Sequence, residues 1–505
     1  MPAPLHRHLT DVVHALLDEF RVVVVTGARQ VGKSTLARAV LDRRPGAYVT
    51  LDLPDALERA IADPLGLVDA QRSHGGLTVI DEVQLAPQLL RAVKLAVDRD
   101  ERPGAFLLTG SANLLRMRTV SETLAGRAAY VELGPLTLTE RLGQPPPRTI
   151  DDAFGASTAE EFVARLPTAA ADAGAAPALR DSLLSAVVAG GMPGTLHMDT
   201  TARRHWYSAY VSTFVERDLW QLGRVDDVLA FRRLFTLAML RTGGLLNRSD
   251  LAADAALDHR TSTRYMDMLD VGYQLRTLTP YAASRGKRLV KMPKVFARDS
   301  GMAAHLMRVD SWDSACEIAA AGALFETWML GEILAIDSVG AAPSSAHFWR
   351  TSAGSEVDLL LERGTELVGV EMKAGATVRW SDTRALAAVR DGFGDRFRMG
   401  IIAYLGDEVR VLDDRICAVP AWSLLGVGEA AALLAEELRA PYAARPGAAL
   451  VTGRAMRGVR VQEVATLLGV DEATVEHWER TAYEDAPLSV VRRLAEEFGV
   501  VVQLG

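Results

Sequence analysis

The sequence predicts an α/β protein whose N-terminal part is a parallel sheet covered by helices on both faces. Short apolar strands recur at 22–26, 47–51, 77–81 and 105–109, with helical patterns between them. Continuous apolar strands that alternate with helices are typical of parallel sheets, because both faces of such strands are buried. Strands return at 346–405, which indicates a second α/β domain between helical stretches.

The length and composition are those of a multidomain globular protein. At roughly 150 residues per domain, a chain of 505 residues has room for several domains. Apolar residues make up 49% and charged residues 24% of the chain, which excludes a disordered or fibrous protein. Because the net charge is −8, any binding of nucleic acid must come from a local basic surface.

The chain carries no pattern of export or membrane insertion. Its two cysteines, Cys316 and Cys417, cannot form a disulfide framework and are typical of a reducing compartment. Residues 1–20 form an amphipathic helical pattern with charges throughout rather than a signal peptide. No apolar run approaches the roughly 20 residues that span a bilayer. We therefore expect a cytoplasmic protein without a membrane partner.

A phosphate-binding loop follows the first strand directly. The run GARQVGKS at 27–34 fits the pattern G-x-x-x-x-G-K-[ST], and a helix begins at Thr35. In such a loop, backbone amides surround the phosphates, the lysine reaches the β- and γ-phosphates, and the serine hydroxyl binds Mg²⁺. We therefore predict ATP and Mg²⁺ as cofactors. The predicted binding residues are Gly27, Ala28, Arg29, Gln30, Val31, Gly32, Lys33, Ser34 and Thr35, with Lys33 also catalytic and Ser34 also a metal ligand.

Polar residues at the ends of two later strands would complete this site. The strand at 77–81 ends in Asp81-Glu82, and we assign Asp81 to the metal and Glu82 to the catalytic base. An acidic pair alone more often solvates a turn, but the loop at 27–34 favours the functional interpretation. Ser111, after the next strand, is placed to sense the γ-phosphate. Arg127 is a candidate arginine finger for a neighbouring subunit, against the alternative of a solvated arginine.

Several motifs in a fixed order resemble one family. They are GARQVGKSTLA, VIDEVQLAP, LLTGSANLL, LAGRAAYVELGPLTLTE and, later, GGMPG. This set resembles the bacterial and archaeal AAA-type P-loop ATPases that carry a C-terminal domain of unknown function, over residues 5–425 with an interruption at 143–180. The resemblance implies ATP binding, ATP hydrolysis and self-association into a homo-oligomer. It does not supply a substrate.

A basic stretch lies in the middle of the chain. Residues 231–295 carry twelve Lys and Arg against five acids, a local charge of +7. Within it, 247–270 reads as helix, turn and helix, and 273–291 as a hairpin with basic tips, a layout that resembles a winged helix. The predicted DNA contacts are Arg260, Thr261, Thr263, Arg264, Arg285, Lys287 and Arg288. The alternative is a module that packs between the ATPase and its partner.

Two alternating runs around a turn at 362–366 predict a nuclease-like site. Asp358 lies on one strand, and Glu371 and Lys373 share a face of the next. If the register brings them together, the carboxylates can hold Mg²⁺ and the lysine can stabilise developing charge. The spacing resembles the PD-(D/E)xK nuclease superfamily, in which Glu326 matches the helical acid. This implies Asp358, Glu371 and Lys373 as catalytic residues and Asp358, Glu371 and Glu326 as metal ligands; the same fold also serves as an inactive scaffold.

The C-terminal run at 461–500 resembles the helix-turn-helix of phage-repressor-type regulators. Gly469 ends its first helix and Asp471 caps its second. Residues 451–505 hold six Arg and nine acids, a local charge of −3 that opposes phosphate contact. For this unit a protein partner therefore stays as open as DNA.

The whole sequence predicts a Mg²⁺-dependent ATPase that binds DNA and cleaves it under ATP control. The alternatives are an ATP-gated DNA-binding regulator with an inactive nuclease fold, and a protein-remodelling ATPase. The predicted segments are a P-loop AAA-type ATPase core at 1–142, a linker or insertion at 143–180, a helical and winged-helix-like domain at 181–310, a nuclease-like α/β domain at 311–426, a linker helix at 427–449 and a small all-α helix-turn-helix at 450–505.

Overall fold

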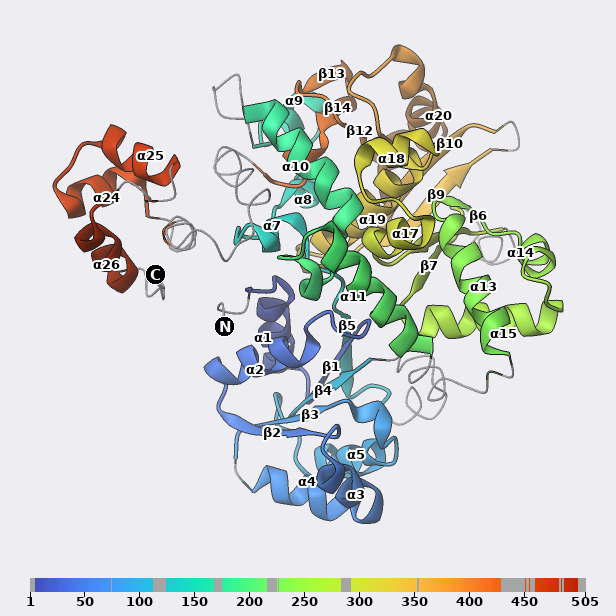
Figure 1. Ribbon diagram of the computed structural model, residues 1–505, viewed down its shortest axis with the longest axis vertical. Helices are drawn as coiled ribbons and strands as arrows, with labels where there is room; N and C mark the ends of the chain where they lie inside the picture. The colour runs from blue at the N-terminus through green and yellow to red at the C-terminus, as the bar shows by residue number, and fades with distance from the viewer. Residues whose placement is uncertain are drawn as a thin grey trace.

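The structure is a computed structural model. It describes residues 5–73, 75–111, 124–167, 175–215, 227–282, 292–351, 354–427, 459–480 and 486–497, with Val225, Leu450, Arg454 and Tyr483. The N-terminal α/β domain lies at the bottom of Figure 1, a helical part at the right, a second α/β domain at the top and three C-terminal helices at the left. No helix among the described residues is long and apolar enough to cross a bilayer.

The N-terminal domain is built on five parallel strands in the order β2-β3-β4-β1-β5. These strands are β1 (Val22–Thr26), β2 (Gly46–Thr50), β3 (Leu77–Asp81), β4 (Phe106–Gly110) and β5 (Ala128–Glu132). The parallel sheet predicted from the apolar runs is confirmed, and β5 is a further strand that the sequence did not predict. Because the strands are parallel, the chain after β1, β3, β4 and β5 emerges at one edge of the sheet.

Helices cover both faces of this sheet, as the continuous apolar strands require. Leu9, Val13 and Leu36 pack with Val23 and Val25 on one face, and the α4–α5 helices pack on the other. The helices are α1 (Leu9–Glu19), α2 (Lys33–Arg43), α3 (Pro54–Ala62), α4 (Pro64–Arg72) and α5 (Leu89–Arg99), with the 3-10 turn η1 (Val83–Leu85) after β3.

The stretch 143–180, for which the sequence predicts a linker or insertion, contains helices. It contains the helices α8 (Thr149–Gly155), α9 (Ala159–Val163) and the start of α10 (Ala175–Ala189), preceded by α7 (Leu138–Arg141). Phe154 and Phe162 are buried, and α8 and α9 lie against strands of the second α/β domain. These aromatic side chains make the segment part of the packed structure.

A helical part with a small antiparallel sheet follows. Its helices are α11 (Thr200–Thr213), α13 (Val228–Leu240), α14 (Arg248–Asp254), α15 (His259–Val271), α17 (Ser300–Met307) and α18 (Trp312–Glu317), with the turn η3 (Pro193–Thr195). The strands β6 (Gly244–Leu245), β7 (Leu275–Leu278) and β8 (Lys294–Ala297) pair in the order β6-β8-β7. The helices α14 and α15 lie where the sequence places them. The second strand, β8, begins at Lys294, after the end of the hairpin predicted at 273–291, and the winged-helix identity stays a prediction.

The second α/β domain has a mixed sheet in the order β13-β14-β12-β11-β10-β9. Its elements are α19 (Ala321–Val339), β9 (Ser345–Arg350), β10 (Glu356–Arg363), β11 (Glu366–Lys373), η5 (Trp380–Thr383), α20 (Arg384–Phe393), η6 (Gly394–Arg396), β12 (Phe397–Tyr404), β13 (Arg410–Asp413), β14 (Ile416–Pro420) and α21 (Ala421–Leu424). A bridge between Pro280 and Phe348 joins the small sheet to this one.

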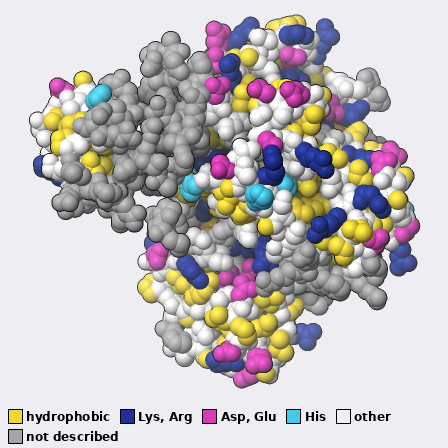
Figure 2. Space-filling model, in the orientation of Figure 1, with side chains coloured by type: hydrophobic (Ala, Val, Ile, Leu, Met, Phe, Trp, Pro, Cys, Tyr) yellow, Lys and Arg dark blue, Asp and Glu magenta, His cyan; other side chains and the backbone are white. Residues whose placement is uncertain are grey.

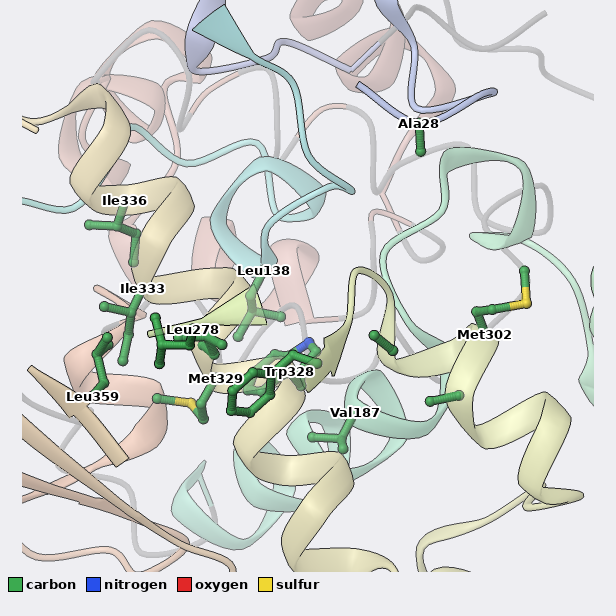
Figure 3. Close-up of a cluster of buried hydrophobic side chains, with 14 of the residues drawn as sticks. Ala28, Leu138, Val187, Leu278, Met302, Trp328, Met329, Ile333, Ile336 and Leu359 are labelled. Atoms are coloured by element: carbon green, nitrogen blue, oxygen red, sulfur yellow. The ribbon is translucent and has the colours of Figure 1, made fainter. Parts of the chain in front are cut away.

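One continuous apolar core connects these parts. The cluster of buried side chains in Figure 3 includes Ala28 and Leu138 from the N-terminal part of the chain, Met302 of α17, Trp328 of α19 and Leu359 of β10. The C-terminal helices α24 (Val461–Leu468), α25 (Glu472–Arg480) and α26 (Leu488–Glu497) have a separate small core. The N-terminal and second α/β domains are therefore packed as one body at their common core.

Candidate functional site

The glycine-rich loop has a backbone that only its own residue types allow. Gly27 has φ +153°, and a Cβ there would lie 2.2 Å from the backbone oxygen of Leu133. Gly32 has φ +98° and directly precedes helix α2. Gln30 also has a positive φ, 63°. Such left-handed turns direct successive N–H groups inward, which fits a bound phosphate chain.

The loop closes around the ammonium group of Lys33. This side chain is buried, and Nζ donates hydrogen bonds to the backbone oxygens of Gly27, at 3.1 Å, and Ala28, at 2.8 Å. Ser34 is half-buried and Thr35 exposed in the first turn of α2. The predicted phosphate-binding residues therefore form one contiguous feature, a loop and helix start that fit ATP.

Asp81 is held rigidly at the carboxyl end of β3. It is buried and accepts hydrogen bonds from the hydroxyls of Thr109 and, at 2.7 Å, Tyr48. Burial and this bond to Asp81 raise the pKa of Tyr48 to about 12, so the hydroxyl stays a donor. Since β4 lies between β1 and β3, Thr109 fixes the carboxylate beside the phosphate loop, where Mg²⁺ would be held.

Glu82 belongs to a small polar network. Its Oε2 accepts hydrogen bonds from Gln84 Nε2 and, at 3.0 Å, from Ser111 Oγ. Gln84 Nε2 also donates to Ser111 Oγ at 2.9 Å. The structure thus brings the predicted base and the predicted sensor together. Gln84 was missed by the sequence reasoning, although it lies only two residues after Glu82.

Arg127 lies at the opposite edge of the sheet. It directly precedes β5, whose first residue Ala128 pairs with Val22 at the start of β1. Its Nε forms an ion pair with Asp98 at 2.5 Å. Because a strand rises about 3.3 Å per residue, Arg127 is separated from the loop after Thr26 by about 15 Å along the sheet. Arg127 therefore lies away from the phosphate loop of its own chain, and its role as an arginine finger for a neighbouring subunit stays a prediction.

Three charged residues that sequence reasoning missed lie next to the phosphate loop. Glu132 ends β5 directly beside Thr26 of β1. Its Oε1 accepts hydrogen bonds from Arg298 and, at 2.8 Å, from Arg276. Tyr273 also donates to the Thr26 hydroxyl at 2.7 Å. We call Glu132, Arg276 and Arg298 the interdomain triad, because its members come from β5, β7 and the end of β8.

The interdomain triad borders a cavity of about 330 Å³. Residues that line it come from the N-terminal segment, β5, β8 and α19, and include Arg7 and Ala28. Arg7 donates to the backbone oxygen of Val31 at 2.6 Å and forms a buried ion pair with Glu140 at 3.1 Å. Arg7 therefore fixes the phosphate loop from outside it. The two arginines of the interdomain triad, Arg276 and Arg298, border the free volume of the cavity.

The predicted nuclease-like residues come together through the β10–β11 register. Leu359 pairs with Val370, which sets Asp358 opposite Glu371. The carboxylate of Asp358 accepts a hydrogen bond from Met372 N at 2.9 Å. Lys373 Nζ lies 2.6 Å from Glu371 Oε1. The convergence that the alternating pattern predicts is thus present in the sheet.

A further lysine lies among Asp358 and two other acids, Glu326 and Glu356. Lys294 of β8 has only 4% of its side chain exposed, and Nζ lies 2.8 Å from Glu326, 2.5 Å from Glu356 and 3.3 Å from Asp358. Burial and the charge of Asp358 raise the pKa of Glu326 to about 8 and that of Glu371 to about 7. Among the described residues, no group of three or more His, Cys, Asp or Glu is placed to hold a metal ion. An active metal site here stays a prediction.

The predicted DNA-contacting residues are only partly described. Arg260 and Arg264 are exposed on α15, and Thr261 and Thr263 are half-buried there. Arg285, Lys287 and Arg288 lie outside the described residues. Other cations of the basic stretch are paired with acids, namely Arg241 with Asp254, Arg248 with Asp267, Arg276 with Glu132 and Lys294 with Glu326. Basic and acidic side chains accordingly alternate over this part in Figure 2.

Sequence comparisons divide the chain into three regions. Residues 19–142 match the AAA domain, residues 180–313 a domain of unknown function (DUF8612), and residues 321–424 another domain of unknown function (DUF4143). The uncharacterized proteins Mb2031c of Mycobacterium bovis and Rv2008c of Mycobacterium tuberculosis are each 31% identical to the chain over 419 residues, or 82% of this chain and 83% of each relative.

Solved structures resemble part of the chain. A Walker-type ATPase of Pyrococcus abyssi has 14% identity and a TM-score of 0.35, and the match covers 59% of this chain and 94% of the other. AMPPCP-bound DnaA of Aquifex aeolicus has 12% identity and a TM-score of 0.21, with 52% and 85% covered.

Proposed function

The chain belongs to one family with these two mycobacterial proteins and carries an AAA domain of the P-loop ATPase type, and from this premise we propose that its nucleotide state controls its second α/β domain. The match of residues 19–142 to the AAA domain supports an ATPase of the P-loop type. The control of a distant domain is our inference, and the interdomain triad is the observation that carries it. DNA as the substrate and its cleavage by the second α/β domain are likewise proposed.

At the nucleotide, each described residue has a role that its position supports. Lys33 neutralises phosphate charge inside the loop, and Ser34 and Asp81 would hold Mg²⁺, which polarises the terminal phosphate when bound. Glu82 orients the attacking water, and Gln84 and Ser111 fix the direction of its carboxylate. Because Ser111 follows β4, between the loop strand and the Asp81 strand, it is placed to report a change at the γ-phosphate.

From the nucleotide, the signal passes through the interdomain triad. A terminal phosphate beside Thr26 would compete with Glu132 for Arg276 and Arg298, since guanidinium groups bind phosphate and carboxylate oxygens in the same geometry. If Arg276 or Arg298 exchanges Glu132 for the phosphate, the β7–β8 strand pair moves with it. A bridge between Pro280 and Phe348 joins this strand pair to β9 of the second α/β domain. Loss of the phosphate after hydrolysis restores the ion pairs.

The second α/β domain is the proposed output of this switch. The facing pair of Asp358 and Glu371, with Lys373 beside it, supports DNA cleavage of the PD-(D/E)xK type. A second candidate function is an ATP-gated DNA-binding regulator, and the observation that favours it is the ammonium group of Lys294 among the carboxylates. The two candidates share the ATPase and the triad and differ only in whether the acids ever bind a metal.

The test combines ATP turnover with DNA cleavage. We expect Lys33→Ala to abolish ATP binding, and Glu132→Gln to keep ATP binding while uncoupling it from the second α/β domain. Cleavage of linear, supercoiled and single-stranded DNA is then measured with Mg²⁺ or Mn²⁺, with and without ATP, against Asp358→Ala. Cleavage that disappears in Asp358→Ala supports the nuclease; salt-sensitive DNA binding without cleavage supports the regulator. An ATP affinity unchanged in Lys33→Ala would refute the nucleotide site.

A further inference from the structure

We propose that Lys294 is an internal cation that keeps the carboxylate cluster of Glu326, Glu356, Asp358 and Glu371 closed to divalent metal ions, and that metal binds there only when β8 withdraws this side chain. The inference concerns regulation of the second α/β domain and in that respect rests on the proposed function. It names a residue outside that domain as the controlling group.

The distances show an ammonium group among three carboxylates. Three carboxylates from α19 and β10 lie between 2.5 and 3.3 Å of Lys294 Nζ. Carboxylate oxygens are the preferred ligands of Mg²⁺ and Mn²⁺, and a single positive charge with three donors is the weaker counter-ion for such a cluster. The lysine thus satisfies the acids and at the same time blocks their common space.

The cluster also retains an unused ligand atom. Glu371 is 7% exposed, and its Oε2 is buried without a hydrogen-bond partner among the described residues. Its other oxygen bonds Lys373, and Asp358 faces it across the strand pair. An orphaned carboxylate oxygen is costly when buried, unless a cation or water satisfies it in another state of the protein. Glu371 Oε2 therefore indicates that the cluster binds a cation in addition to Lys294 in another state of the protein.

Lys294 lies on the strand that leads to the interdomain triad, and this connection could move its side chain. It begins β8, and Arg298 of the interdomain triad follows one residue after the strand ends. In an extended strand the two side chains are about 13 Å apart and on the same face. β8 is only four residues long and lies between β6 and β7; all four residues pair with β7 and two also pair with β6, so a shift at Arg298 moves the strand as a unit and Lys294 with it.

The test measures Mn²⁺ binding to the full chain without nucleotide or DNA. The variants are Lys294→Met, which removes the charge, Lys294→Arg, which keeps it, and Lys294→Met with Asp358→Asn. Electron paramagnetic resonance counts free Mn²⁺. We expect one Mn²⁺ per chain in Lys294→Met, bound at least about ten-fold more tightly than in the wild type, and no such gain in the other two. Because ATP is absent, failure of the ATPase proposal leaves this result unaffected.

Folding of the variants is followed in the same samples. Lys294→Met that folds only with Mn²⁺ present supports the proposal, because the metal replaces the lost charge. If Lys294→Met does not fold, the charge-balanced Lys294→Gln/Glu356→Gln variant is measured, with the same expected gain. A folded variant that binds Mn²⁺ no more tightly than the wild type would overturn the proposal. Failure of both variants to fold in the presence of Mn²⁺ would also overturn it, because the ion pairs of Lys294 would then have a purely structural role.

Discussion

Replacement of Glu332 by glutamine should remove a specific loss of stability that accompanies a rise in pH from about 4.5 to about 8. Glu332 of α19 is 6% exposed and accepts hydrogen bonds from Leu138 N at 3.1 and 3.0 Å, and thereby joins α7 to α19. Burial raises its pKa to about 8, against the opposing effects of Leu138 N–H and Arg141. The folded chain therefore binds a proton at neutral pH that the unfolded chain has released.

The sign and size of the effect follow from this difference. Since the folded-state pKa lies above the unfolded value, stability is complete below about pH 4.5 and falls as the pH rises to about 8. At about 1.4 kcal/mol for each pKa unit, the loss amounts to about 3–5 kcal/mol. In the Glu332→Gln variant, the amide side chain would stay neutral and could still accept a hydrogen bond from Leu138 N.

The assay is the melting temperature of wild type and Glu332→Gln between pH 5.5 and 8.5. We expect the wild type to lose several degrees more than the variant over this range. Glu58→Gln, which removes an exposed acid on α3, is the matched control and should follow the wild type. Parallel melting curves of wild type and Glu332→Gln across the whole range would refute the reasoning.

Three further predictions concern the ATPase. Glu82→Gln should retain ATP binding in a fluorescence titration but lose at least about 100-fold in turnover; wild-type turnover would contradict its role as base. Tyr48→Phe loses one buried hydrogen bond to Asp81, so its melting temperature should fall by an amount equivalent to about 1 kcal/mol. The dependence of its ATP turnover on the Mg²⁺ concentration should also become weaker. A Mg²⁺ titration of turnover that matches the wild type would contradict this. If Arg127 acts in trans, a mixture of Arg127→Ala and Lys33→Ala should turn over more ATP than the two variants measured separately. A turnover of the mixture equal to the sum of the two separate values would exclude that role.

The sequence signals for the predicted phosphate site are local ones. The loop at 27–34 and the acidic pair Asp81-Glu82 are each formed by residues that are neighbours in the sequence. Each can be recognised from a strand followed by a turn, without knowledge of the rest of the fold. The facing of Asp358 and Glu371 was also predictable, since the alternating side chains and the short turn between the strands fix the register. Strand β5 was missed because its five residues are all half-buried and too few to show a pattern.

The interdomain triad could not be predicted in the same way. Glu132 lies 144 residues from Arg276 and 166 residues from Arg298, so no spacing in the sequence relates them. The charge count at 231–295 treated Lys294 as part of a basic surface, whereas the side chain is buried among acids. Composition records the number of charges in a stretch, while the fold decides which of them reach solvent.

The continuous apolar core has a consequence for how this protein can be divided. Three sequence regions contribute side chains to that core, so a boundary drawn in the sequence, such as the one near residue 142, cuts through a shared interior. A fragment ending there would expose apolar surface and be prone to aggregate and to be degraded. The C-terminal helices, which have their own core, could be exchanged or lost as a unit while the rest of the chain is inherited whole.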